Sequence, residues 1–166
     1  MTYIYDPVPK VGVSYFLHDD HREILHLVKK LSSMLPSRPE TQSVLQQLRW
    51  RVGRHLYLEE NAIFLFFRLI RDTMDKETRH HIHDHDQLQA MLNSLLHQHE
   101  PEWEITFHRF KVAYSHHHQF AQNSLYPLLE TVLTYQQQHY LTEQLMKARE
   151  FGYYSLPHLR AHYHFT

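Results

Sequence analysis

The chain has 166 residues, a formal net charge of −1 and no cysteine. That length suits one domain with its own hydrophobic core, and the near-neutral charge provides no basic surface for nucleic acid or for an acidic membrane. The absence of cysteine excludes disulfides, thiolate metal ligands and thiol catalysis, while the three glycines favour helices. The opening residues lack a signal-peptide pattern and no apolar run has the length of a membrane span, so we expect a cytoplasmic protein.

The first half of the chain predicts an extended arm and two helices. Residues 1–16 contain two prolines and a glycine and are interpreted as an N-terminal arm. Apolar residues at helical spacing then predict a helix from about Leu17 to Leu35, followed by a proline-containing turn. A second helix is expected from Pro39 to near Arg71. Its inward-facing row is Leu45, Leu48, Val52, His55, Glu59, Ile63 and Phe66.

The second half predicts two more long helices and a short one. A third helix follows a turn at 73–75 and ends near His97. The fourth begins at Pro101, and Pro127 is expected to kink or end it. A short fifth helix is expected over about 142–151, and a C-terminal tail over 152–166. The inward-facing row of the fourth helix is Phe107, Phe110, Tyr114, His117, Ala121, Leu125 and Leu128.

Four amphipathic helices with short connections predict an all-α protein. The expected architecture is an antiparallel up-down four-helix bundle over residues 17–151, with the short fifth helix added at the end. Because each long helix has one apolar row, these four rows should meet in one core.

Histidine is the unusual residue of this chain, with 18 copies. Imidazole is the commonest metal ligand in proteins, and every long helix has at least one histidine in its apolar row. Glu59 shares such a row with His55 one turn away, and a buried carboxylate is costly unless it is paired or binds a metal. The alternative for this pair is a buried histidine–carboxylate contact without a metal. The candidate ligands are His21, His55, Glu59, His81, His85 and His117.

Four short motifs along the chain resemble those of the hemerythrin and HHE cation-binding family. They are Asp20-His21 on the first helix, His55-x-x-x-Glu59-Glu60 on the second, His81-x-x-x-His85 on the third, and His117 followed by Leu125-Tyr126-Pro127 on the fourth. The last is similar to the Leu-Phe-Pro ending of the family. The four motifs occur in order and at compatible spacing.

The resemblance implies a bundle that holds two non-haem irons, bridged by an oxo group and two carboxylates. By analogy His81, His85 and His117 bind one iron, His21 and His55 bind the other, and Glu59 bridges them. An open position then takes O2, NO or peroxide. Members of the family act as oxygen carriers, oxygen or redox sensors, iron stores or iron–sulfur repair proteins.

One departure from the family pattern concerns the second bridging carboxylate. It should follow His117 by four or five residues, where this chain has Ala121 and Gln122. We therefore expect a weaker second metal or a single-metal site, with the carbonyl of Gln122, or His118 beside the seam, as possible substitute ligands.

Two other functions stay open at the level of sequence. His18-Asp19 and His83-Asp84-His85-Asp86 are compatible with an HD-type metal-dependent phosphohydrolase, although no aspartate follows Asp86 to complete that site. A helical structural or sensory module with zinc, or with no metal, is the other alternative. No nucleophile–base pair is recognisable, so the sequence does not favour an enzyme.

Overall fold

A computed structural model describes residues 13–64 and 75–151 of the chain. Two rods in these ranges are composite: α2 continues into the π-helical segment η1, and α5 continues through the π-helical segment η3 into α6. We call them the α2 rod and the α5 rod. The elements are α1 (Val13–Leu31), α2 (Pro39–Leu58), η1 (Glu59–Phe64), α4 (Asp75–Leu95), α5 (Glu102–Phe120), η3 (Ala121–Leu125), α6 (Tyr126–Val132) and α7 (Tyr135–Phe151).

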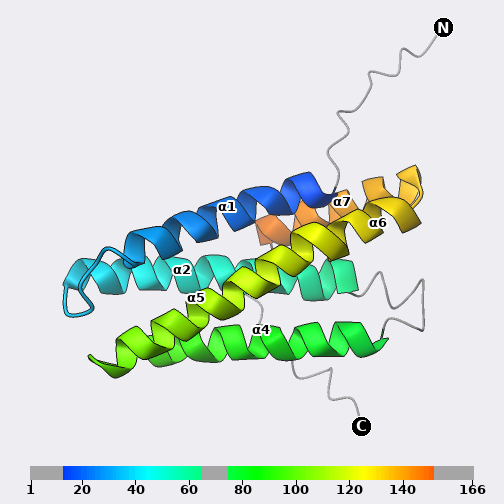
Figure 1. Cartoon of the computed structure of the whole chain (residues 1–166). Coiled ribbons are helices and arrows are strands. Elements are labelled where there is room, and N and C mark those ends of the chain that lie inside the picture. The colour runs from blue at the N-terminus through cyan, green and yellow to red at the C-terminus, as the bar shows by residue number, and fades with distance from the viewer. Residues whose placement is uncertain (1–12, 65–74, 152–166) are drawn as a thin grey trace, which may run out of the picture.

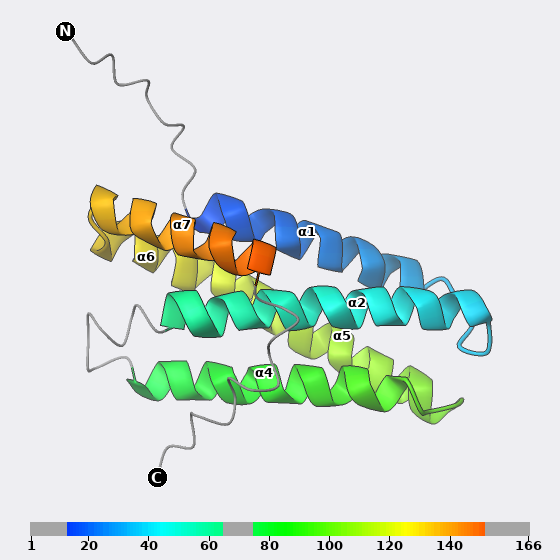
Figure 2. The same cartoon turned by 180° about the vertical axis from the view of Figure 1, so that it is seen from behind.

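The rods form an antiparallel bundle (Figure 1). In chain order α1 packs on α2, α2 packs on α4, and α4 packs on α5, while the end of the α5 rod returns to α1 through α6. From behind, α7 lies against α1 and the α2 rod (Figure 2). The predicted four-helix bundle with an additional fifth helix is therefore confirmed.

Several helix boundaries differ from the sequence-based expectation. The first helix begins at Val13, so the last residues of the predicted arm are helical, and the fully buried Val13 extends the apolar row of α1 by one turn. The same helix ends at Leu31 rather than Leu35, where the hydroxyls of Ser32 and Ser33 bond back to carbonyls of the last turn. Residues 1–12, the expected end of the second helix near Arg71, and the tail over 152–166 lie outside the described residues.

The fifth helix is longer than predicted because it has a capping box at its start. The hydroxyl of Thr134 accepts a hydrogen bond from the backbone N–H of Gln137 at 3.3 Å, and the side-chain oxygen of Gln137 accepts one from the N–H of Thr134 at 2.9 Å. This reciprocal pair satisfies two N–H groups that a helix start leaves without partners. The helix therefore begins at Tyr135 and not near residue 142.

The π-helical segments change which side chains face the core. A π turn adds one residue, so the rows before and after it no longer align at regular helical spacing. In α6, directly after η3, the buried residues are Tyr126 and Leu129, whereas Leu128, which regular spacing places inward, is only partly buried. Pro127 lies in the first turn of α6, and the rod continues past it to Val132.

Among the residues that the structure describes, the core consists of two apolar clusters, one on each side of a polar layer. One cluster includes Leu17, Leu58 and Ala121, and the other includes Ile24, Leu56 and Leu88. The polar layer comprises His21, His55, Glu59, His85 and His117, all of them buried. Within the described ranges, no helix has the length and apolar character needed to cross a membrane.

Candidate metal centre

Each rod places its polar-layer residue by the same local pattern. On α1, His21 follows Leu17 by four residues and precedes Ile24 by three. Leu17 belongs to one apolar cluster and Ile24 to the other. His117 likewise lies between Tyr114 and Ala121 on the α5 rod. Helical spacing therefore turns each imidazole toward the bundle axis, and the apolar residues on both sides exclude water from the layer.

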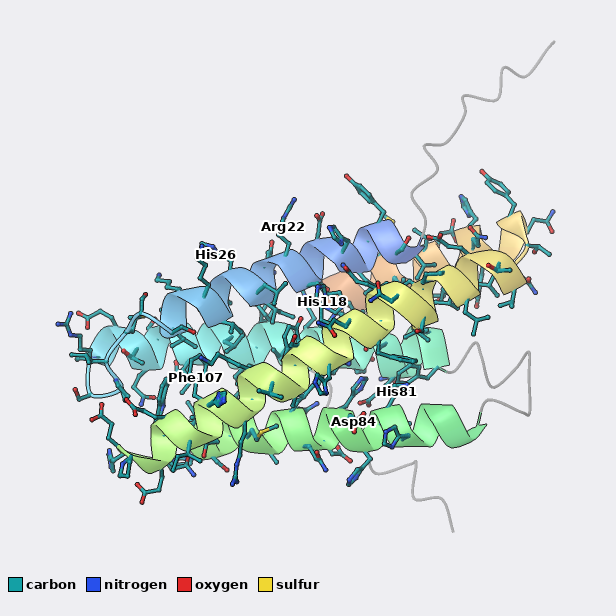
Figure 3. All side chains as sticks on the ribbon, in the orientation of Figure 1. Arg22, His26, His81, Asp84, Phe107 and His118 are labelled. Carbon is teal, nitrogen blue, oxygen red and sulfur yellow. The ribbon has the colours of Figure 1, made fainter. Side chains whose placement is uncertain are left out.

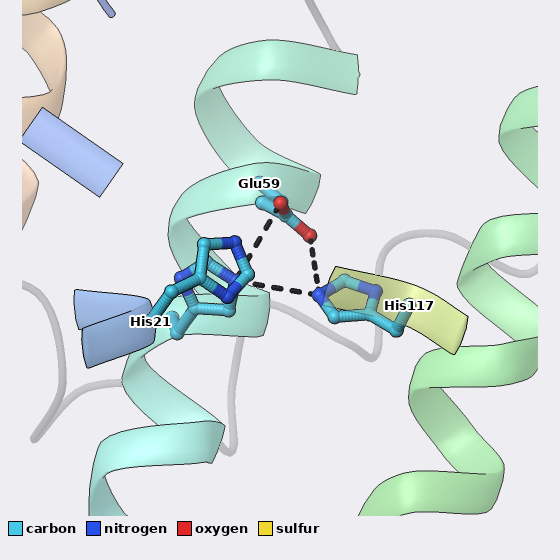
Figure 4. Close-up of side chains that lie close together, drawn as sticks. His21, Glu59 and His117 are labelled. Carbon is cyan, nitrogen blue, oxygen red and sulfur yellow. Dashed lines mark hydrogen bonds and ion pairs between the residues drawn. The ribbon is translucent and has the colours of Figure 1, made fainter. Parts of the chain in front are cut away.

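Four of these side chains converge tightly. His21, His55, Glu59 and His117 each offer one ligand atom, and these atoms all lie within 4.8 Å of one another. Figure 4 shows His21, Glu59 and His117 turned toward one another. The Nε2 atoms of His55 and His117 are 3.4 Å apart. The two imidazoles are therefore close enough to belong to one metal centre.

The two carboxylate oxygens of Glu59 face different histidines. Oε2 lies 3.2 Å from Nε2 of His85 and 3.4 Å from Nε2 of His117. Oε1 lies 3.5 Å from Nε2 of His55. Oε2 and the Nε2 of His85 are buried yet make no hydrogen bond of regular geometry. A carboxylate that divides its oxygens between two groups of imidazoles in this way fits a bridge between two cations.

Glu60 holds His85 from the other side. The Nδ1 of His85 contacts Oε1 of Glu60 at 2.9 Å, and Phe64 stacks on the ring at 5.5 Å between centroids. A second partner on the far nitrogen of a metal-binding histidine fixes the orientation and tautomer of its ring. Glu59 thus places its carboxylate in the polar layer, and Glu60 places its carboxylate on the opposite side of the His85 ring.

Burial and charge set the protonation of the layer. Burial lowers the pKa of His21, of His55 and of His117, the last to about 3, so these imidazoles are neutral and able to bind a metal. Burial also acts to lower the pKa of His85, but its contacts with Glu59 and Glu60 outweigh burial and raise it to about 9. Against the effect of burial, the nearby histidines hold the pKa of Glu59 well below its usual value.

Two tyrosine hydroxyls, from Tyr114 and Tyr126, occupy both ring nitrogens of His21. The hydroxyl of Tyr114 lies 2.9 Å from Nδ1, and that of Tyr126 lies 2.9 Å from Nε2. Tyr126 also donates a hydrogen bond to Oε1 of Glu59 at 2.7 Å. Because the proton of Tyr126 points to Glu59, the hydrogen-bond network assigns the proton of His21 to Nε2 and makes Tyr114 the donor to Nδ1.

Sequence reasoning did not select Tyr126 as a site residue. Regular spacing placed Leu125 and Leu128 inward, and only the π turn of η3 brings Tyr126 into the layer. The sequence feature that could have indicated Tyr126 is the tripeptide Leu125-Tyr126-Pro127. Its tyrosine stands where the Leu-Phe-Pro ending of the hemerythrin and HHE family has phenylalanine.

Three other expected residues lie beside the layer rather than in it. The ring of His81 stacks on Phe120 at 4.0 Å, between α4 and α5 (Figure 3). The amide nitrogen of Gln122 lies 2.8 Å from Nδ1 of the exposed His18. The half-buried ring of His118 lies 4.4 Å from that of His21. Ligation by these three side chains therefore stays a prediction with less geometric support than the polar layer has.

A comparison with protein families identifies the class of the chain. Residues 13–129 match the model of the hemerythrin HHE cation-binding domain, which covers more than half of the sequence. The chain therefore belongs to the hemerythrin HHE family, as its motifs indicated. Searches of curated proteins and of solved structures found no match.

Proposed function

We propose that this protein is a non-haem iron protein whose polar layer binds up to two irons. His85 and His117 hold one ion, His21 and His55 hold the other, and Glu59 bridges them. The observation that carries this proposal is the division of the Glu59 carboxylate between the two groups of imidazoles, at 3.2–3.5 Å. Membership of a cation-binding family also supports metal binding by this chain.

The ligand set is compatible with iron, and the apolar clusters around it limit the size of the molecules that can reach a bound metal. Imidazole and carboxylate donors without a thiolate suit iron, and also zinc or manganese. Bound iron would supply an open coordination position and a change of oxidation state. Since the apolar clusters enclose the layer, we propose that its ligand is a small molecule such as O2, NO or peroxide, or that the protein handles iron itself. The cytoplasmic location stays a prediction.

Elemental analysis of the purified protein tests this function. We expect iron at one to two atoms per chain in the wild type, and a clear loss of metal in His85→Ala because that imidazole is fully buried beside Glu59. His83→Ala is the matched control, since His83 lies two residues away on the same helix and is exposed. Equal metal content in both variants, or none in the wild type after reconstitution with ferrous iron, would contradict the proposal.

A bundle with zinc, or without metal, is the second candidate. It is favoured by the contacts that already join the layer, including Tyr126 to Glu59 at 2.7 Å and His85 to Glu60 at 2.9 Å. Zinc in the elemental analysis, with no near-ultraviolet absorption of a ferric pair, would favour it. An HD-type phosphohydrolase has less support, because His18 and His83 are exposed in the structure and contact Gln122 and Gln87.

A further inference from the structure

We propose that the hydroxyl oxygen of Tyr126 is a metal ligand that replaces the missing second carboxylate, on the side of the centre held by His21 and His55. This inference rests on the proposed function, because it adds a protein ligand to the same centre. It concerns a residue at which this chain differs from the Leu-Phe-Pro ending of the family it resembles.

The Tyr126 hydroxyl stands at the spacing expected of a neighbouring ligand. It lies 2.9 Å from Nε2 of His21 and 2.7 Å from Oε1 of Glu59. Two ligands at right angles on one cation lie about 3.0 Å apart, so these spacings are close to those of neighbouring ligands. The same Oε1 is 3.5 Å from Nε2 of His55. The second ion, for which the sequence predicts weaker binding, would thus have four ligands: His21, His55, Glu59 and Tyr126.

The local backbone explains how Tyr126 reaches this position. Gln122 is one of the two positions at which the family pattern predicts a carboxylate, but its amide contacts His18 near the surface. The π turn of η3 follows directly and shifts the helical rows by one residue. As a result Tyr126, only 2% exposed, enters the layer from the same rod that would otherwise have supplied the carboxylate.

Burial and Glu59 hold the pKa of the Tyr126 hydroxyl well above its ordinary value, so only a bound cation would displace its proton. The phenolate would then carry one negative charge, as the missing carboxylate would. Coordination of the oxygen to an ion would break the O–H bond of Tyr126 and release its proton to solvent. The proton of His21 would move from Nε2 to Nδ1, and Tyr114 would turn its own O–H away from Nδ1 and accept that proton at 2.9 Å. No electron is transferred.

The test uses the visible spectrum of the full-length protein loaded with ferric iron. Phenolate bound to ferric iron gives an intense visible charge-transfer band, and excitation within it enhances tyrosine ring vibrations in the Raman spectrum. Imidazole and carboxylate ligands do not produce these ring vibrations. We expect the band in the wild type and its loss in Tyr126→Phe. Metal content, measured in each sample, shows that a missing band is not simply missing iron.

Tyr114→Phe is the matched control. It removes the other buried hydroxyl that contacts His21, but that hydroxyl lies on the far nitrogen, Nδ1. We expect Tyr114→Phe to keep the band. If Tyr126→Phe does not fold, ring-deuterated wild type and ring-deuterated Tyr114→Phe answer the question, because the enhanced vibrations shift on deuteration only if they arise from tyrosine.

The outcomes separate this inference from the proposed function. Bound ferric iron without a phenolate band in the wild type overturns the ligand role of Tyr126 and leaves the iron centre standing, with Tyr126 as a hydrogen-bond donor to Glu59. A band that persists in Tyr126→Phe has the same effect. If no iron binds to the wild type, the proposed function fails and this inference fails with it.

Discussion

His85 differs from the other three histidines of the polar layer in its charge. Its contacts with Glu59 and Glu60 outweigh burial and raise its pKa to about 9, whereas burial lowers the pKa of His21, His55 and His117. In the metal-free protein at neutral pH, one imidazolium therefore neutralises part of the charge of the two glutamates. A metal ion that binds this layer takes over that role and displaces the proton.

This arrangement predicts how the stability of the metal-free protein depends on pH. A raised folded-state pKa at His85 contributes stability below the unfolded value of about 6.5, and this contribution is lost as pH rises toward 9. The pKa values of His21, His55 and His117 are lowered in the folded state, so the unfolded chain takes up protons at these histidines more readily. Stability therefore also falls as pH drops below about 6.5. Glu59, also lowered, adds to the loss at acid pH.

We therefore expect maximal stability of the metal-free protein near neutral pH, with a decline on the alkaline side approaching about 1.4 kcal/mol per pH unit. Urea unfolding in the presence of a chelator, repeated from pH 5 to 9, measures this curve. His85→Gln should flatten the alkaline limb because it removes the group whose pKa is raised. An alkaline limb of unchanged slope in that variant would show that His85 is not its cause.

At the scale of helical elements, the contact between α1 and α2 contains a buried ion pair directly beside the ligands. Arg54 bonds to Asp20, with side chains only 7% and 1% exposed, and each residue precedes a polar-layer histidine in the sequence. The guanidinium also lies 4.8 Å from the centre of the Trp50 ring. This pair fixes the two helices at the level where His21 and His55 must meet.

Removal of one partner of this pair should destabilise the bundle strongly. We expect Arg54→Met to lower the free energy of unfolding by about 3–5 kcal/mol, because it leaves the carboxylate of Asp20 buried without its cation. Arg51→Met is the matched control. Arg51 also lies over Trp50, at 5.1 Å, and pairs with Glu23 of α1, but that pair is about one third exposed.

For Arg51→Met we expect a loss of about 1 kcal/mol or less, as is typical of exposed ion pairs. Urea denaturation of both variants provides the measurement. Similar losses in the two variants would mean that burial of the Asp20–Arg54 pair contributes nothing beyond an ordinary surface contact.

In the bundle as a whole, one polar layer joins four rods, and the apolar contacts between the described residues of these rods fall into two separate clusters. A metal in this layer binds the folded bundle in preference to the unfolded chain. At a free metal concentration of about 100 times the dissociation constant, we expect stabilisation of about 2.7 kcal/mol and a rise of about 5–10 °C in the melting temperature.

Thermal unfolding followed by circular dichroism, with and without added ferrous iron under anaerobic conditions, measures this rise. His55→Ala should show a clearly smaller rise than the wild type because it lacks a buried ligand of one of the two ions. Iron that binds to the wild type without raising its melting temperature would place the metal outside the polar layer, for example on exposed histidines.

The helical class, the four apolar rows and five of the buried polar residues could be predicted from the amino-acid pattern, because helical spacing is a local property of each segment. The contacts between these residues could not: Glu59 divided between two histidine groups, Glu60 behind His85, Gln122 directed to His18, and Tyr126 brought into the layer. For Tyr126 the cause is the π turn of η3, which shifts the later side chains of its rod by about 100°. Distances between rods depend on packing across the bundle, which the periodicity of one helix does not specify.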